Sequence, residues 1–241
     1  MTAHRPYPLV TGPWIMRQTW SDLAFLHWSL PVEQMRALVP ASLPLDTFEG
    51  EAWLGIVPFK MEYVSLRGCP NVPKLSFFPE LNVRTYVKVG GKPGVYFFSL
   101  DAGNPIAVSL ARRWFRLPYY HADMATHRDG NTVYYDSRRT HRGAPPAAFK
   151  AHCHATSGVE IAAPGSLEHW LTERYCLYTT DPHGAVLRGE IHHQQWPLQT
   201  GEVDIEANTL VEPLGLTLSK QPRWCHVVHT IKMVAWNLRR V

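Results

Sequence analysis

The sequence predicts a mainly β protein, built as a curled antiparallel sheet or barrel with a central cavity and a few short helices. Twenty prolines and sixteen glycines are spread along the 241 residues, which is typical of many turns between short strands. Residues 80–87 alternate polar and apolar side chains, as a strand with two different faces does. A hydrophobic fraction of 45% allows a single domain, residues 1–241, to bury a substantial core.

The N-terminal third is predicted to contain two long strands and one helix. Residues 14–30 form an extended strand, and residues 31–39 form a short helix that ends before a proline. Residues 52–66 form the second strand. Pro58 lies inside it and cannot donate to a ladder, so it indicates a sheet edge or a bulge.

The central segment, residues 77–124, is the most informative. Its first strand is followed by a glycine-rich turn at residues 90–94 and a returning strand at 95–100, which together predict a hairpin. Asn104-Pro105 supplies an N-cap and a proline at the first helical position. The helix ends at Leu117-Pro118.

The later elements are predicted from the same signals. Strands are expected at 121–135 and 149–156, a short helix capped by Ser166, and a second hairpin from 174–180 and 185–196. The last apolar segment, residues 226–236, fits a strand or a helix equally well by periodicity.

Four polar side chains share one face of the central strand: Glu80, Asn82, Arg84 and Tyr86. Two interpretations stay open. In one, the row faces solvent and its Glu and Arg pair weakly. In the other, it lines a barrel cavity, where Arg84 could hold a carboxylate or enolate and Glu80 could move protons.

The central segment resembles the substrate-binding core of the acetoacetate decarboxylase superfamily, and more closely its YqjF-like branch, domain of unknown function 2071. The decarboxylases have a glutamate-bearing strand, a Gly-Lys-x-Gly hairpin, a helix that begins Gly-Arg-Glu, and then Pro-Lys-Lys. The matching positions are Glu80, Ala111-Arg112-Arg113 and Pro118-Tyr119-Tyr120. Both lysines are absent. A phenol cannot form the Schiff base that the first lysine forms with a ketone, so decarboxylation by that route is excluded.

The YqjF-like resemblance covers nearly the whole chain. It is carried by several motifs in order: His27-Trp28, the helix 31–39, residues 45–50, Trp53, Val57-Pro58-Phe59, residues 171–175, and His193 with Trp196-Pro197. It implies the acetoacetate decarboxylase-like fold with its central cavity. The branch has no assigned chemistry, so the resemblance defines the fold better than the function.

The other candidate site residues near the helix each have more than one interpretation. Tyr119 and Tyr120 could donate to a developing oxyanion or act as general acids, or they could pack as aromatics after the helix. Arg112 and Arg113 differ by about a hundred degrees around the helix, so at most one can enter a cavity; Arg113 is the candidate.

Three residues from the motifs His27-Trp28 and His193 with Trp196-Pro197 complete the candidate set: His27, His193 and Trp196. We expect them to contact a ligand. The alternative is that each is a packed strand residue.

Composition excludes other partners. No metal or other cofactor is expected, because neither the pair His152 and His154 nor any other histidine set matches a zinc motif. The net charge of +4 comes without a nucleic-acid motif, and no apolar run is long enough for a membrane helix. Four widely spaced cysteines and no signal peptide indicate a cytoplasmic protein. A homo-oligomer is compatible with the sequence.

The sequence therefore predicts a protein that binds a small anionic or carbonyl-bearing molecule. If it is an enzyme, we expect lyase-like or isomerase-like acid/base chemistry without a Schiff base, with Glu80, Tyr119 and Tyr120 as catalytic residues. The alternative is a non-catalytic ligand-binding or sensing protein that kept the cavity.

Overall fold

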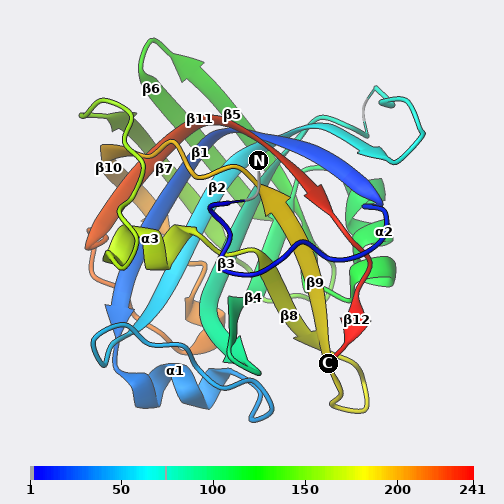
Figure 1. Ribbon diagram of the computed structural model, residues 1–241. Helices are drawn as coiled ribbons and strands as arrows, with labels where there is room; N and C mark the ends of the chain where they lie inside the picture. Colours follow the sequence, from blue (N-terminus) through cyan, green and yellow to red (C-terminus); the bar gives the residue numbers. More distant parts are fainter. Residues whose placement is uncertain (1–2, 74) are drawn as a thin grey trace.

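Strands dominate the computed structural model, which describes residues 3–73 and 75–241. In order they are β1 (Met16–Leu30), β2 (Ala52–Leu66), β3 (Phe78–Val89), β4 (Lys92–Ala102), β5 (Tyr119–Asp129), β6 (Thr132–Arg139), β7 (Ala148–Ala155), β8 (Cys176–Thr180), β9 (Val186–His193), β10 (Gln199–Asn208), β11 (Trp224–Ala235) and β12 (Arg239–Arg240). All twelve belong to one hydrogen-bonded sheet (Figure 1).

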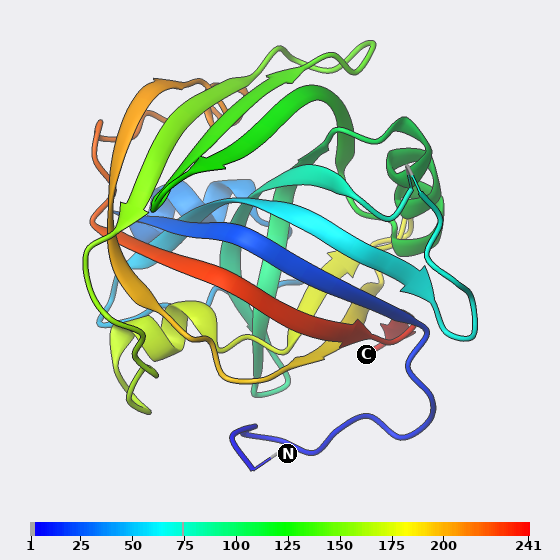
Figure 2. The same ribbon diagram turned by 90° about the horizontal axis from the view of Figure 1, so that it is seen from above.

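The sheet closes on itself twice. Its order is β12-β9-β8-β4-β3-β2-β1-β11-β10-β7-β6-β5, and β9 also pairs with β11 while β4 also pairs with β5. The first ring therefore contains β1–β4, β8, β9 and β11, and the second contains β1–β4, β5–β7, β10 and β11. Seen from above, β5–β7 lie on one side of the shared strand β1 and β8–β9 on the other (Figure 2). The predicted barrel is confirmed.

The two rings have interiors of different character. Leu81, Val83 and Val87 of β3 pack with Phe149 and other apolar side chains of the second ring. The alternate β3 side chains face the first ring. The period-two pattern of β3 thus separates an apolar core from a polar row on the opposite face.

Pro58 marks an irregularity in the shared wall. β2 lies between β1 and β3, so the prediction of a sheet edge is wrong. The prediction of a bulge is confirmed: the β1–β2 register shifts between Ser21 and Leu26, whose partners are Lys60 and Ile56. The missing N–H of the proline falls opposite this irregular stretch.

Other differences follow from turns. Residues 121–135 were predicted as one strand, but the chain reverses at Gly130, which has a φ of 55°, and forms β5 and β6. β10 and β12 were not predicted. Residues 226–236 are a strand for most of their length, because β11 pairs with β1 along eleven residues.

Two of the helices begin at the N-caps that the sequence predicted. They are α1 (Val32–Leu38), α2 (Pro105–Phe115), α3 (Leu167–Thr172) and the 3₁₀ turn η1 (Glu212–Leu214). Asn104 accepts hydrogen bonds from the Ile106 and Ala107 amides, and Ser166 accepts one from the His169 amide. In the described part of the chain, none of the helices has the length and apolarity needed to cross a bilayer.

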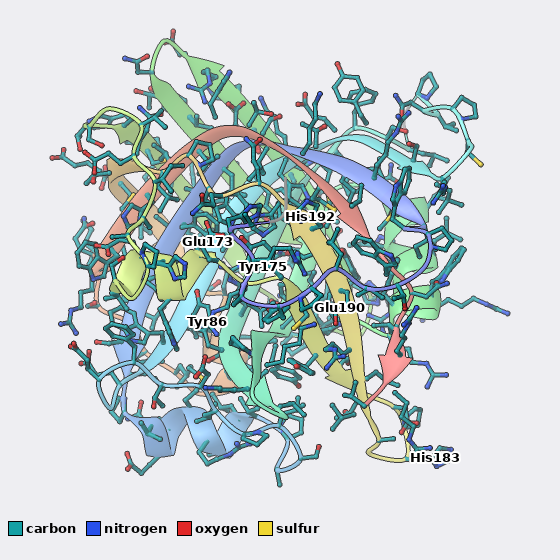
Figure 3. The ribbon with its side chains drawn as sticks, in the orientation of Figure 1. Tyr86, Glu173, Tyr175, His183, Glu190 and His192 are labelled. Carbon is teal, nitrogen blue, oxygen red and sulfur yellow. The ribbon has the colours of Figure 1, made fainter. Side chains whose placement is uncertain are left out.

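The β8–β9 hairpin forms part of the wall of the first ring, between β4 and β11. Glu173 and Tyr175, just before β8, lie well inside the outline of the molecule, whereas His183 lies at the tip of the hairpin (Figure 3). Glu173 accepts hydrogen bonds from the Tyr175 hydroxyl and, at 2.9 Å, from the Trp196 amide. This buried carboxylate ties the segment after β9 to the start of β8.

Candidate functional site

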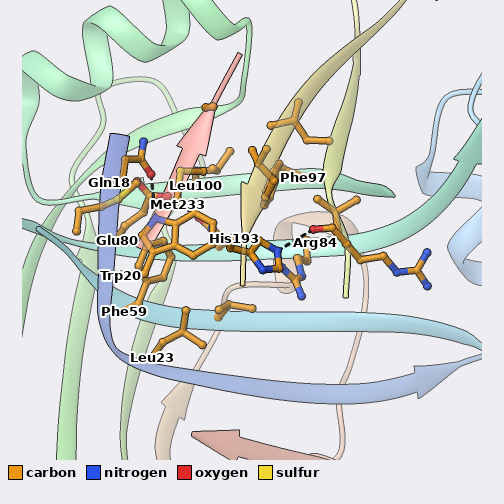
Figure 4. Close-up of a pocket in the computed structure, with 18 of the residues that line it drawn as sticks. Gln18, Trp20, Leu23, Phe59, Glu80, Arg84, Phe97, Leu100, His193 and Met233 are labelled. Atoms are coloured by element: carbon orange, nitrogen blue, oxygen red, sulfur yellow. Dashed lines mark hydrogen bonds between the residues drawn. The ribbon is translucent and has the colours of Figure 1, made fainter. Parts of the chain in front are cut away.

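The first ring contains a cavity of about 110 Å³ that is partly open to solvent. Its walls are mostly aromatic and aliphatic side chains, among them Trp20, Phe25, Phe59, Phe97, Leu100 and Trp196. The polar row of β3 runs along it, with Glu80 and Arg84 lying apart from each other (Figure 4). The interpretation of this row as a cavity lining is therefore the one that the geometry favours.

At one end, Glu80 meets Tyr119. The helix stop at Leu117-Pro118 directs the chain into β5, and Tyr119, its first residue, pairs with Leu100 of β4. The Tyr119 hydroxyl lies 3.2 Å and 3.4 Å from the two Glu80 carboxyl oxygens. Glu80 is only 2% exposed.

Burial sets the protonation of this end. Desolvation raises the pKa of Glu80 to about 8, although hydrogen bonds from Tyr119 and Asn82 act in the opposite direction. The pKa of Tyr119 is raised well above its usual value by burial and by the nearby Glu80. At neutral pH this end of the cavity is therefore polar and mostly uncharged.

At the other end, Arg84 lacks a counter-charge. Its Nη2 lies 3.4 Å from the Tyr86 hydroxyl and 3.3 Å from the Leu171 carbonyl oxygen, and its Nε is buried without a partner. The guanidinium lies 5.2 Å from the Phe25 ring centroid. Among the described residues, no carboxylate lies within ion-pair distance of this side chain.

A second arginine, Arg174, lines the same end. It forms an ion pair with Asp46 at 2.5 Å and donates to the Trp170 carbonyl oxygen at 2.6 Å. Its Nη2 is buried and has no partner. Desolvation lowers the pKa of Arg174, and the nearby Arg84 lowers it further. Two guanidinium groups and one carboxylate leave this end with an excess of one positive charge.

His27 and Tyr86 lie beyond Arg84 and do not line the cavity. The Nε2 of His27 is 2.7 Å from the Tyr86 hydroxyl. Burial, together with Arg84 and His226, lowers the pKa of His27 well below its usual value. His27 and Tyr86 therefore pack against Arg84 on its side away from the cavity. The prediction from the sequence was that they contact a ligand, and this geometry does not place them there.

His193 and Trp196 do line the cavity. The two ring nitrogens of His193 face backbone carbonyl oxygens, 2.7 Å from Gln194 and 3.3 Å from Arg174, and its ring stacks on Tyr175. The ring of Trp196 stacks on Trp20, and its indole nitrogen is buried without a partner.

Tyr120 and Arg113 lie outside the cavity. Strand alternation turns Tyr120 away from Tyr119, so that its ring lies 4.2 Å from the guanidinium of Arg139. Arg113 is exposed on α2. Arg112 is also exposed, and it donates to the backbone oxygen of Tyr119 at 2.5 Å. Tyr120 and Arg113 were predicted as site residues because the sequence does not determine the rotation of the helix or the phase of the strand. In the structure, neither residue has access to a ligand in the cavity.

Several cavity residues were not predicted. Arg174 and Thr172 lie in the segment 171–175 that carries part of the resemblance, and Gln18 lies at the start of β1. The available signal for Arg174 was its place in that resembling segment. Its partner Asp46 lies in another resembling segment, 128 residues away.

The described residues offer the cavity neither a lysine nor a metal site. Lys60 is paired with Asp22 and Lys92 with Glu190, and no described lysine is among the cavity residues. No group of three or more His, Cys, Asp or Glu residues in the described chain could hold a metal ion.

Comparison with known proteins assigns the family. A family model described as an uncharacterized conserved protein, domain of unknown function 2071, matches residues 17–232. The chain belongs to this family. It is also 44% identical to the uncharacterized protein YqjF of Bacillus subtilis over 229 residues, which are 95% of this chain and 93% of that protein. The YqjF-like resemblance is confirmed.

Solved structures share the fold at low identity. An acetoacetate decarboxylase-like enzyme from Sphingomonas wittichii RW1 has a TM-score of 0.66 at 14% identity, covering 99% of this chain and 97% of that chain. The enduracididine biosynthesis enzyme MppR complexed with pyruvate has a TM-score of 0.64 at 11% identity, with 98% and 93% covered. The acetoacetate decarboxylase of Legionella pneumophila has a TM-score of 0.61 at 13% identity, with 99% and 92% covered. The chain therefore has the acetoacetate decarboxylase-like fold.

Proposed function

We propose that this protein binds a small carboxylate that also carries a carbonyl or hydroxyl oxygen, inside the first ring. The observation that carries the proposal is Arg84, a cation in a mostly apolar cavity with no carboxylate beside it. Arg84 is partly buried, and a charge withdrawn from water is costly unless it is paired, so an anionic ligand would supply the missing partner. The structural neighbour complexed with pyruvate shows that this fold can accommodate a small oxo acid.

If the protein is an enzyme, Glu80 and Tyr119 would provide acid/base chemistry without a Schiff base. A carboxyl group with a pKa of about 8 is near the value that suits a general acid or base at neutral pH. The Tyr119 hydroxyl could donate to a developing oxyanion. The alternative is a binding or sensing protein, in which the same carboxyl group only hydrogen-bonds the ligand.

Binding can be tested by calorimetric titration with pyruvate, acetoacetate and levulinate, alongside the neutral ketones acetone and pentanone. We expect saturable binding of one or more oxo acids, and weaker binding of the ketones. Arg84→Met should weaken oxo-acid binding about tenfold or more, since a hydrogen bond to a charged group contributes about 1.5–3 kcal/mol. Arg113→Met removes an exposed arginine outside the cavity and is the matched control. Equal binding by both variants, or no binding of any oxo acid, would contradict the proposal.

Catalysis and binding are separated by deuterium exchange. The oxo acid that binds most tightly, incubated in D₂O, would acquire deuterium next to its ketone if Glu80 removes a proton there, and nuclear magnetic resonance would follow the loss of signal. Glu80→Gln keeps the shape of the side chain and removes its titrating proton. It should therefore abolish the acceleration of deuterium exchange by the protein while the ligand still binds. Binding without exchange in the wild type would favour the sensing alternative.

A further inference from the structure

The two polar ends of the cavity are far apart. Glu80 and Arg84 are four residues apart on β3, so their Cα atoms are separated by roughly 13 Å. The Arg84 guanidinium does not shorten this distance, because it contacts Tyr86 and the Leu171 carbonyl, beyond Arg84 as seen from Glu80. A compact molecule such as pyruvate cannot touch both ends at once.

The space between the ends is apolar. Phe25, Val57, Phe59, Phe97 and Leu100 are among the apolar side chains of the cavity wall, and Asn82 is the β3 residue whose side chain lies between Glu80 and Arg84 on the same face. The cavity volume of about 110 Å³ is several times the 10–15 Å³ or so that a single water needs, so the cavity can hold a ligand of several non-hydrogen atoms. Such a space suits an unbranched chain better than a ring system with many atoms.

The charges of the ends also differ. The Arg84 end carries two guanidinium groups and the carboxylate of Asp46, so it lacks one negative charge. The Glu80 end combines a carboxyl, a phenol and an amide, and it has no arginine or lysine among its contacts. The cavity therefore has an anion-binding end and a neutral hydrogen-bonding end.

From the separation of the two ends, we propose that the ligand is an unbranched monocarboxylic acid of about six to eight carbons, with its carboxylate at Arg84 and a ketone or hydroxyl oxygen at Glu80 and Tyr119. This inference rests on the proposed function and specifies its ligand class. The chain between the two oxygens lies along the apolar wall. The two ends select a molecule by length as well as by charge.

The test is a calorimetric series at pH 7 with acetate, butyrate, hexanoate, octanoate and dodecanoate. Each methylene that enters the apolar wall should tighten binding about fourfold, and the gain should stop at about octanoate because the chain then spans the two ends. The oxo acid of the best length, with its ketone next to the terminal methyl, should bind wild type about threefold or more tighter than the unsubstituted acid. Tyr119→Phe should reduce that advantage, while Arg84→Met weakens the whole series.

The outcomes separate this inference from the proposed function. If acetate and pyruvate bind as tightly as octanoate and Arg84→Met weakens them, the cavity binds compact anions and the length inference is wrong. Affinity that keeps rising to dodecanoate would also overturn it, because the separation of the two ends would then not set the length of the chain. If no acid binds, short or long, the proposed function falls as well.

Discussion

Opposing effects act on the Glu80 carboxyl group. Desolvation favours its neutral form, whereas hydrogen bonds from Tyr119 and Asn82 favour its ionised form, and desolvation is the larger effect. The result is a neutral hydrogen-bonding group in the same cavity as the uncompensated Arg84. A carboxylate in ion-pair contact with Arg84 would have cancelled its positive charge, to which we assign the recognition of an anionic ligand.

The titration of Glu80 should be visible in stability. Because its pKa is raised to about 8 in the folded state, the folded state binds more protons than the unfolded state between about pH 4.5 and pH 8. The free energy of unfolding contributed by Glu80 therefore falls as pH rises through this range, by several kcal/mol at most (about 1.4 kcal/mol for each pKa unit). Urea denaturation of wild type and Glu80→Gln at pH 5, 7 and 9 measures it, and the Gln variant should gain relative to wild type as pH rises.

The control for that comparison is Glu33→Gln, an exposed acid in the first turn of α1. It should leave the pH profile of wild type nearly unchanged. Parallel profiles for wild type and Glu80→Gln would mean that Glu80 is ionised in the folded protein at neutral pH, which would contradict its assignment as the neutral end.

Sequence could predict this part of the site only in outline. The phase of one strand was enough to bring Glu80, Asn82 and Arg84 to a common face, because alternation is a local property. The ion pair of Arg174 with Asp46 joins residues from distant parts of the chain, so no local pattern predicts it. Which of two adjacent tyrosines enters the cavity depends on where β5 begins, and that too was beyond the sequence.

At the scale of elements, the bulge in β1 is held by an acidic residue in a left-handed conformation. Asp22 has a φ of 49°, and its side chain pairs with Lys60 at 2.7 Å and with Arg128 at 2.5 Å. The bulge faces Pro58 of β2, so the side chain ties together strands whose ladder is interrupted. In the sequence, Pro58 indicated an irregular strand pairing. No feature of the sequence identified Asp22 as the residue that adopts the left-handed conformation at the bulge.

Two substitutions at Asp22 separate its backbone from its side chain. Asp22→Ala and Asp22→Gly both remove the ion pairs, but only glycine tolerates the positive φ without cost. The glycine variant should be more stable than the alanine variant by about 1 kcal/mol, and both should be less stable than wild type. Chemical denaturation measures the free energy of unfolding of both variants. If the alanine variant is the more stable of the two, the backbone at position 22 is not strained.

At the scale of the whole molecule, the closure of the first ring depends on short pairings. β4 and β8 share two residue pairs and β9 and β11 share three, whereas β1 and β11 share eleven. The hairpins along β3–β4 and β8–β9 were predictable because their partners are neighbours in sequence. The pairings that close the rings were not, because they join distant segments: the sequence predicted a curled sheet or barrel but not which strands close it.

Gly94 makes the β4–β8 approach possible. A Cβ added there would lie 2.7 Å from the Cys176 backbone oxygen and 2.8 Å from its sulfur, which is too close for the strands to keep their spacing. Gly94→Ala should lower the free energy of unfolding by about 1–3 kcal/mol and speed amide hydrogen exchange in β8. Gly158→Ala, where no atom lies within 4 Å of the added Cβ, should stay within about 0.5 kcal/mol of wild type. Unchanged exchange in β8 of Gly94→Ala would show that the ring does not depend on this contact.

The most direct measurement of the central claim is a crystal structure of the protein with an unbranched oxo acid of about octanoate length. We expect its carboxylate within about 3.2 Å of the Arg84 guanidinium and its ketone oxygen at a similar distance from Glu80 or Tyr119. Difference density elsewhere on the molecule, or a ligand in the cavity whose carboxylate does not contact Arg84, would contradict the account.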